Sequence, residues 1–148
     1  VDLSFGMLAN ARTDAPLVQG DALHLPFPDE SVDGLTCGLA LRNLVDLKGS
    51  LVEIARILRP GGRLALLEVA EPENRVLRWG HGIYFGKVVP RIGGLLSDAD
   101  AYRYLPASVA YLPPPPELVE LIRHSGFPDA DRRLLSTGIT QLLTGTRG

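Results

Sequence analysis

Hydrophobic and polar residues alternate through the first half of the chain in the pattern of strands and helices. Short apolar runs at 17–20, 32–38 and 63–69 predict strands, and the third is apolar enough to be buried on both faces. Between the last two runs, apolar residues recur every three or four positions from Leu47 to Leu58. This spacing predicts an amphipathic helix that Pro60-Gly61-Gly62 ends. Because alternating strands and helices build parallel sheets, the pattern predicts an α/β fold with a mostly parallel sheet.

The start and the middle of the chain predict smaller elements. Val1–Leu3 has the character of the end of a strand, and Ser4 is suited to cap a short helix that runs to Ala11. Residues 73–112 break the strand–helix pattern and contain the single tryptophan and all four tyrosines. We expect this segment to form short helices inserted beside the sheet.

The C-terminal part predicts one helix and two strands. A run of four prolines leads into helical spacing over 116–125, which Gly126 is suited to end. Apolar runs at 130–135 and 139–144 predict the last two strands, and Gly138 between them allows a tight antiparallel return.

Composition narrows the class of protein. With 148 residues, of which 22% are charged and 45% hydrophobic, the chain is expected to form a single domain. Its parts would be an α/β part (1–72), a helical insertion (73–112) and a C-terminal helix and strand pair (113–148). A net charge of -2 argues against general electrostatic binding of nucleic acid, and one cysteine, Cys37, excludes a disulfide framework. The three histidines are too scattered for a metal site, and no apolar run is long enough to span a membrane. We therefore expect a cytoplasmic protein.

Three segments of the chain resemble one enzyme family. GDALHLPFPDESVDGLTCGLALRN, EIARILRPGGRLALLEVAEP and YFGKVVPRIGGLLSDADAYRYLPASV are similar to ubiquinone/menaquinone C-methyltransferases of the UbiE/MenG type. The resemblance runs from Val1 to about Gly138. It implies a Rossmann-like class I methyltransferase fold with an antiparallel last strand, and S-adenosylmethionine as the cofactor. It also implies a prenylated quinol substrate, which is demethylmenaquinone or a ubiquinone precursor in its reduced form.

The resemblance assigns cofactor contacts to residues that follow predicted strands. Asp2 would accept hydrogen bonds from the ribose hydroxyls, and Asp21 with Ala22 would contact the adenine. Gly38 would let the methionine part of the cofactor approach the backbone. From the residues alone, each has a simpler alternative: Asp2 as a helix-capping or loop residue, Asp21 as a turn residue, and Gly38 as a glycine needed only for its dihedral angles.

The resemblance places the chemistry on Arg42 and Asn43, just after the strand at 32–38. Arg42 would hold a proton-accepting water or stabilise the phenolate directly, and Asn43 would orient the water or the quinol oxygen. The alternative for Arg42 is a surface salt bridge with Asp46. Tyr102 and Arg103, in the aromatic segment, are candidates for quinone contact.

The chain also departs from the family's pattern at both ends. The family's first strand and its glycine-rich cofactor loop are absent, and QLLTGTRG at the C-terminus differs from relatives. We therefore expect an N-terminally truncated fragment whose strand at 32–38 has an exposed edge. Such a fragment would be poorly stable, would bind the cofactor weakly or not at all, and would itself be inactive. The alternatives are a methyltransferase for another lipid or small molecule, and an inactive remnant. Contact with a membrane surface and homo-oligomerisation are further expectations.

Overall fold

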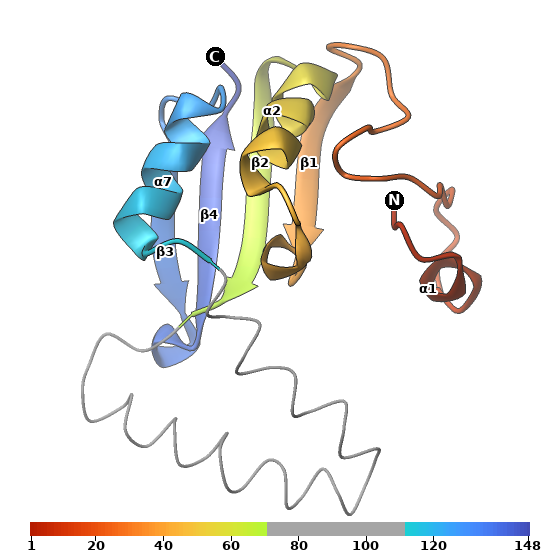
Figure 1. The fold of residues 1–148 in the computed structure, drawn as a ribbon, viewed down its shortest axis with the longest axis horizontal. Helices are drawn as coiled ribbons and strands as arrows, with labels where there is room; N and C mark the ends of the chain where they lie inside the picture. Colours follow the sequence, from red (N-terminus) through yellow and green to blue (C-terminus); the bar gives the residue numbers. More distant parts are fainter. Residues whose placement is uncertain (71–111) are drawn as a thin grey trace, which may run out of the picture.

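The computed structural model describes residues 1–70 and 112–148 (Figure 1). The elements in these ranges are, in chain order, α1 (Phe5–Ala9), β1 (Val32–Gly38), the 3-10 helix η1 (Leu41–Asn43), α2 (Leu47–Ile57), β2 (Leu58–Val69), α7 (Pro115–His124), β3 (Asp131–Leu135), the 3-10 helix η3 (Ser136–Gly138) and β4 (Thr140–Thr146). The predicted insertion at 73–112 lies almost wholly outside the described residues.

Four strands form one mixed sheet in the order β1-β2-β4-β3. β1 and β2 are parallel, whereas β4 runs antiparallel to both β2 and β3. The expected antiparallel last strand is confirmed, and the parallel part of the described sheet is the β1–β2 pair. β1 forms one edge of this sheet, which is the edge expected from the comparison with the family's pattern.

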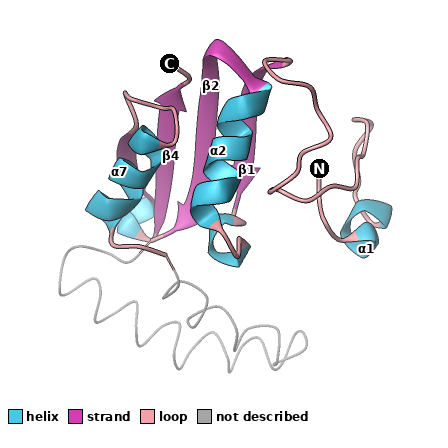
Figure 2. Ribbon diagram, turned by 45° about the horizontal axis from the view of Figure 1, so that its top comes forward, coloured by secondary structure: helices cyan, strands magenta, loops and turns pink. Residues whose placement is uncertain are grey.

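The two strands expected near the N-terminus, at 1–3 and 17–20, are replaced by one isolated bridge between them. Asp2 pairs with Gln19 in a parallel arrangement, through hydrogen bonds from Asp2 N to Val18 O (3.2 Å) and from Gly20 N to Asp2 O (3.1 Å). One bridge is too short to count as a strand. This segment lies on the outer side of β1 in both views (Figures 1 and 2).

The helices begin and end close to where the pattern predicted. Ser4 caps α1 by accepting a hydrogen bond from the Met7 backbone N–H, although α1 ends at Ala9, before Ala11. α2 ends at Ile57, but β2 begins at once with Leu58 rather than at residue 63. The reason is a register shift, because the residues between Leu58 and Arg63 bulge out of the pairing with β1.

Both long helices cover the same face of the sheet (Figures 1 and 2). The core between them and the strands is made of aliphatic side chains and one aromatic ring; its fully buried members include Leu51, Leu58, Leu64, Leu66, Leu118, Ile122 and Phe127. No described helix covers the opposite face. Neighbouring residues of β2 therefore differ in solvent exposure: Leu64 and Leu66 are buried, whereas Leu67 is exposed.

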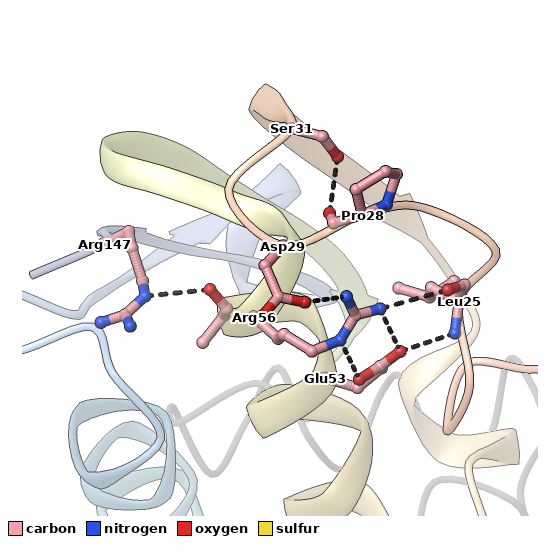
Figure 3. A network of polar contacts seen from close by, with 8 residues as sticks. Leu25, Pro28, Asp29, Ser31, Glu53, Arg56 and Arg147 are labelled. Carbon is pink, nitrogen blue, oxygen red and sulfur yellow. Dashed lines mark hydrogen bonds and ion pairs between the residues drawn. The ribbon is translucent and has the colours of Figure 1, made fainter.

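A polar network ties the loop before β1 to α2 (Figure 3). Arg56 of α2 makes ion pairs with Glu53 (2.7 Å) and Asp29 (2.6 Å), and it also donates to the Leu25 carbonyl (3.2 Å). Glu53 accepts a further hydrogen bond from the Leu25 N–H (2.7 Å). These contacts hold the loop that precedes β1 against α2. They also hold the pKa of Glu53 below its usual value, mainly through the hydrogen bonds from Arg56.

Candidate functional site

The backbone turns sharply where β1 ends. Leu39, the next residue, has a φ of 59°, a left-handed conformation that costs a residue other than glycine about 1–3 kcal/mol. Its N–H donates to the Leu67 carbonyl of β2 (2.8 Å), and the chain then enters η1. The turn places Arg42 and Asn43 at the carboxyl ends of the parallel strands β1 and β2. This is the edge at which open α/β sheets bind ligands.

Arg42 is buried and paired with Glu68 of β2. Its Nη1 lies 2.5 Å from Glu68 Oε1, and the side chains are 10% and 0% exposed. The Arg42 backbone N–H donates to Glu68 Oε2 (3.3 Å), and the Val69 N–H donates to Glu68 Oε1 (2.8 Å). The Nε atom of Arg42 is buried and has no hydrogen-bond partner in the described parts of the chain. Arg42 therefore keeps a buried donor that no described residue uses.

The alternative ion pair expected for Arg42 is wrong. Asp46 instead caps α2 by accepting a hydrogen bond from the Gly49 N–H (2.8 Å). A carboxylate at a helix N-terminus meets unpaired N–H groups, which explains why Asp46 is used there. The Arg42 side chain is thus buried in an ion pair with Glu68 and forms no surface ion pair with Asp46.

Asp2 and Asp21 lie close to one another in the N-terminal segment, since Asp2 pairs with Gln19, two residues before Asp21. Each carboxylate uses one oxygen locally: Asp2 Oδ1 accepts from Ser4 N (2.8 Å) and Asp21 Oδ1 accepts from Leu23 N (2.9 Å). These are the loop and turn roles that their sequence context favours. The second oxygen of each carboxylate accepts no hydrogen bond within residues 1–70 and 112–148, so it can accept one from a ligand's hydroxyl or amino group. The Ala22 N–H likewise has no acceptor in these ranges.

Gly38 faces open space. A Cβ built on it would meet no atom within 4 Å among the described residues, and its φ lies outside the left-handed region. Neither packing nor backbone conformation in the described structure therefore requires glycine at this position. The absence of a side chain leaves the backbone here open to the close approach of a ligand.

The predicted site residues fall into two groups. Asp2, Asp21 and Ala22 belong to the segment outside β1, whereas Gly38, Arg42 and Asn43 belong to its carboxyl end. Each group is held by its own hydrogen bonds, and Asn43 also takes part in an interaction. Tyr102 and Arg103 lie outside the described residues.

Sequence reasoning missed Glu68. It lies in the run Arg63–Val69, which reads as a buried strand, and a glutamate inside such a run is the feature that marks it. A buried carboxylate needs a partner, so its position indicates a nearby cation. Glu68 also acts on Cys37: burial first and the Glu68 charge second raise the pKa of that thiol.

Other features of the described chain offer less chemistry. A groove of about 470 Å³ lies between the C-terminal ends of α2 and α7, lined by Arg56, His124 and Arg147 among others. It mixes both signs of charge and lies at the opposite end of β1 from Gly38. Within the described ranges, no group of three or more His, Cys, Asp or Glu side chains is placed to hold a metal ion. No helix there is long and apolar enough to cross a membrane.

Comparison with solved structures supports the fold. A chain from the complex of the Haloferax volcanii Trm112 methyltransferase activator with a methyltransferase superposes with a TM-score of 0.66 at 23% identity, covering 97% of this chain and 68% of that one. A SAM-dependent methyltransferase from Thermotoga maritima gives 0.56 at 20% identity, covering 88% and 63%. Both share the Rossmann-like arrangement of class I methyltransferases.

Comparison of sequences identifies the family. The demethylmenaquinone methyltransferase of Roseiflexus castenholzii is 44% identical over 96% of this chain and 60% of its own length. The UbiE ubiquinone/menaquinone biosynthesis C-methyltransferase of Geobacter sulfurreducens is 40% identical over 100% and 61%. The chain thus spans about three fifths of the length of these relatives. A sequence model of the ubiE/COQ5 methyltransferase family matches residues 7–147, so the match continues past Gly138 through the C-terminal strand. The chain belongs to the ubiE/COQ5 methyltransferase family.

Proposed function

We propose that the chain is part of an S-adenosylmethionine-dependent C-methyltransferase that acts on a prenylated quinol, either demethylmenaquinol or a ubiquinone precursor. Family membership supports the reaction class, and relatives named demethylmenaquinone methyltransferase support the first quinol. The single observation that carries the proposal is the buried Arg42 at the carboxyl end of β1, with its Nε–H unused in the described chain.

The cofactor side of the site is assigned to four residues. Asp2 accepts hydrogen bonds from the ribose hydroxyls through its unused oxygen, and Asp21 accepts one from the adenine amino group. The Ala22 N–H donates to a ring nitrogen, and the open space in front of Gly38 admits the methionine part. The unused oxygens, the unused N–H and the empty space are the features of the structure that fit this cofactor.

The acceptor side uses Arg42 and Asn43. A quinol ring carbon becomes nucleophilic when the neighbouring hydroxyl loses its proton, because the oxygen's electrons then reach the ring. When bound, S-adenosylmethionine would supply a methyl group on a sulfonium centre: as that carbon bonds to the methyl group in line, the sulfur–methyl bond breaks and its electron pair stays on sulfur. The ring carbon then loses its own proton, which restores the aromatic ring. The Arg42 Nε–H donates to the oxygen that becomes negative, and Asn43 orients the same oxygen or a water beside it. Aligning the two reactants can itself supply about 7–11 kcal/mol of the acceleration.

The prenyl chain of the proposed substrate indicates where the protein would bind it. Quinols of this class carry a long apolar chain, so we propose that the protein meets its substrate at the inner surface of a membrane. Co-sedimentation of the intact protein with lipid vesicles, with and without demethylmenaquinone, tests this, and failure to sediment with either kind of vesicle would contradict it.

The function is tested by incubating the intact protein with S-adenosylmethionine and chemically reduced acceptors. The acceptors are demethylmenaquinol, a ubiquinone-precursor quinol and the dimethyl ether of demethylmenaquinol, which has no hydroxyl that can lose a proton. We expect mass spectrometry to detect one added methyl group on a ring carbon of a quinol and none on the ether.

A matched pair of variants locates the chemistry. Arg42→Met removes the buried donor, whereas Arg63→Met removes an arginine on the exposed face of β2. We expect the first variant to lose turnover and the second to keep it. Binding of S-adenosylmethionine without methylation of either quinol would mean that the acceptor belongs to another class. Failure to bind it would leave an inactive remnant as the better explanation.

A further inference from the structure

Glu68 is the only charged side chain among the buried polar residues of the described chain, which are Ser50, Glu68, Ser125 and Gln141. It lies near the carboxyl end of β2 and points into the helix-covered face, as Leu64 and Leu66 do. Placing a carboxylate there is costly, and a buried ion pair is often no more stabilising than apolar side chains of the same volume. Stability alone therefore gives a weak reason for this residue.

The contacts of Glu68 converge on Arg42. One carboxylate oxygen accepts from the Arg42 backbone N–H, and the other accepts from Arg42 Nη1 and from the Val69 N–H. Glu68 thus holds both the backbone of η1 and the guanidinium that extends from it. Since the guanidinium is planar and rigid, fixing one of its nitrogens also fixes the direction of Nε.

We propose that Glu68 is a positioning residue for methyl transfer: it holds the Arg42 guanidinium so that Nε–H is aimed at the quinol oxygen. This inference rests on the proposed function. Glu68 touches neither substrate nor cofactor and acts through Arg42 alone. Its negative charge also balances the Arg42 cation, so that the arginine remains buried at the site.

The chain contains a close control for this pair. Glu53 of α2 also accepts hydrogen bonds from an arginine, Arg56, and from a backbone N–H, that of Leu25. Its side chain is 15% exposed, and the pair lies at the start of β1 rather than at its carboxyl end. Glu53→Gln therefore makes the same chemical change in a similar ion pair away from the proposed site.

The first experiment measures kcat and KM of the intact protein with S-adenosylmethionine and a reduced quinol. Glu68→Gln is expected to lower kcat about 100-fold, the size that a displacement of about 1 Å produces, and to leave the KM for the cofactor unchanged. Glu68→Asp should recover part of the loss, and Glu53→Gln should match the wild type. Equal kcat values for Glu68→Gln and Glu53→Gln would overturn the inference.

A double variant tests whether Glu68 acts through Arg42. If it does, adding Glu68→Gln to Arg42→Met lowers kcat no further, because groups that act as one unit are not additive. Losses that multiply in the double variant would refute the inference. If Glu68→Gln folds poorly, Arg42→Met/Glu68→Leu provides an apolar replacement of both partners, which is expected to fold normally and to be inactive.

A measurement that does not depend on turnover separates this inference from the proposed function. The Arg42 Nε–H should give a nitrogen-15 NMR signal protected from exchange with water, which Glu68→Gln abolishes and Glu53→Gln leaves in place. If this holds but no quinol is methylated, the proposed function fails and the positioning of Arg42 by Glu68 stands. If Arg42→Met abolishes methylation but Glu68→Gln leaves both the signal and kcat intact, the function stands and this inference fails.

Discussion

Adding one methyl group at Gly38 tests the cofactor side of the site. In Gly38→Ala the new Cβ meets no described atom within 4 Å, and the backbone is not left-handed. The substitution should therefore cost no folding free energy. It is expected to raise the free energy of unfolding by about 0.4–1 kcal/mol, because alanine has fewer conformations to lose in the unfolded chain.

The effect on cofactor binding should be the opposite. If the methionine part of S-adenosylmethionine lies against Gly38, the methyl group fills space that the ligand needs. Overfilling a packed contact costs about 1–3 kcal/mol. Since 1.4 kcal/mol is tenfold in an equilibrium constant, the Kd should rise between about fivefold and 150-fold.

The assay combines calorimetric titration of S-adenosylmethionine with urea unfolding, both on the intact protein. Gly145→Ala in β4 is the control, because the same methyl group there would lie 2.9 Å from the Phe127 Cβ. That variant should lose about 1–3 kcal/mol of stability by overpacking, while its folded fraction binds the cofactor normally. Wild-type affinity in Gly38→Ala would refute the assignment, and so would a loss of stability as large as that of Gly145→Ala.

Three further predictions concern ionisable groups. Glu68→Gln leaves the Arg42 charge buried without its partner and should cost about 3–5 kcal/mol in urea unfolding, whereas Arg42→Met/Glu68→Leu should be close to wild type; equal losses in the two variants would contradict this reasoning. Because the folded protein lowers the pKa of Glu53, this residue stabilises the fold above its unfolded pKa, and the stabilisation is lost as pH falls through the folded pKa. Glu53→Gln should therefore flatten the acid side of the curve of stability against pH. An unchanged curve would contradict this. Burial first and the Glu68 charge second raise the pKa of Cys37, so the free energy of unfolding should fall as pH rises above the usual thiol pKa. Near pH 9, iodoacetamide should alkylate Cys37 more slowly than free cysteine, and faster in Glu68→Gln than in the wild type. A wild-type rate equal to that of free cysteine would contradict the raised pKa.

The long periodic elements could be predicted from the sequence because their periodicity reflects burial on one face. The apolar positions from Leu47 to Leu58 identified α2 to within one residue, since Leu51 and Ile54 face the core. The start of β2 could not be predicted in the same way. Arg59-Pro60-Gly61-Gly62 reads as a turn, yet Leu58 already pairs with Val32, and only that pairing across the sheet makes it a strand.

The candidate site residues came mainly from the family resemblance. The resemblance assigned Asp21, Gly38 and Arg42, each of which follows a predicted strand, and their roles stay predictions. The partner of Arg42 could not be found so, because Glu68 is 26 residues away and the nearer acid, Asp46, looked equally suitable. Asp46 does not pair with Arg42 because its side chain caps the N-terminus of α2.

If a quinol binds at this site as proposed, the Arg42–Glu68 pair also limits how the quinol can lose its proton. An arginine in a protein stays protonated, so Arg42 donates hydrogen bonds and cannot accept the proton. Glu68 already accepts hydrogen bonds from Arg42 Nη1, the Arg42 N–H and the Val69 N–H, and its side chain is 0% exposed, so neither oxygen is open to a water. These contacts therefore argue against a water base held by Glu68, whereas direct stabilisation of the phenolate by Arg42 needs no free oxygen on Glu68. On this reasoning the pair lowers the free energy of the charged oxygen, and the proton passes to solvent or to a base other than these two residues.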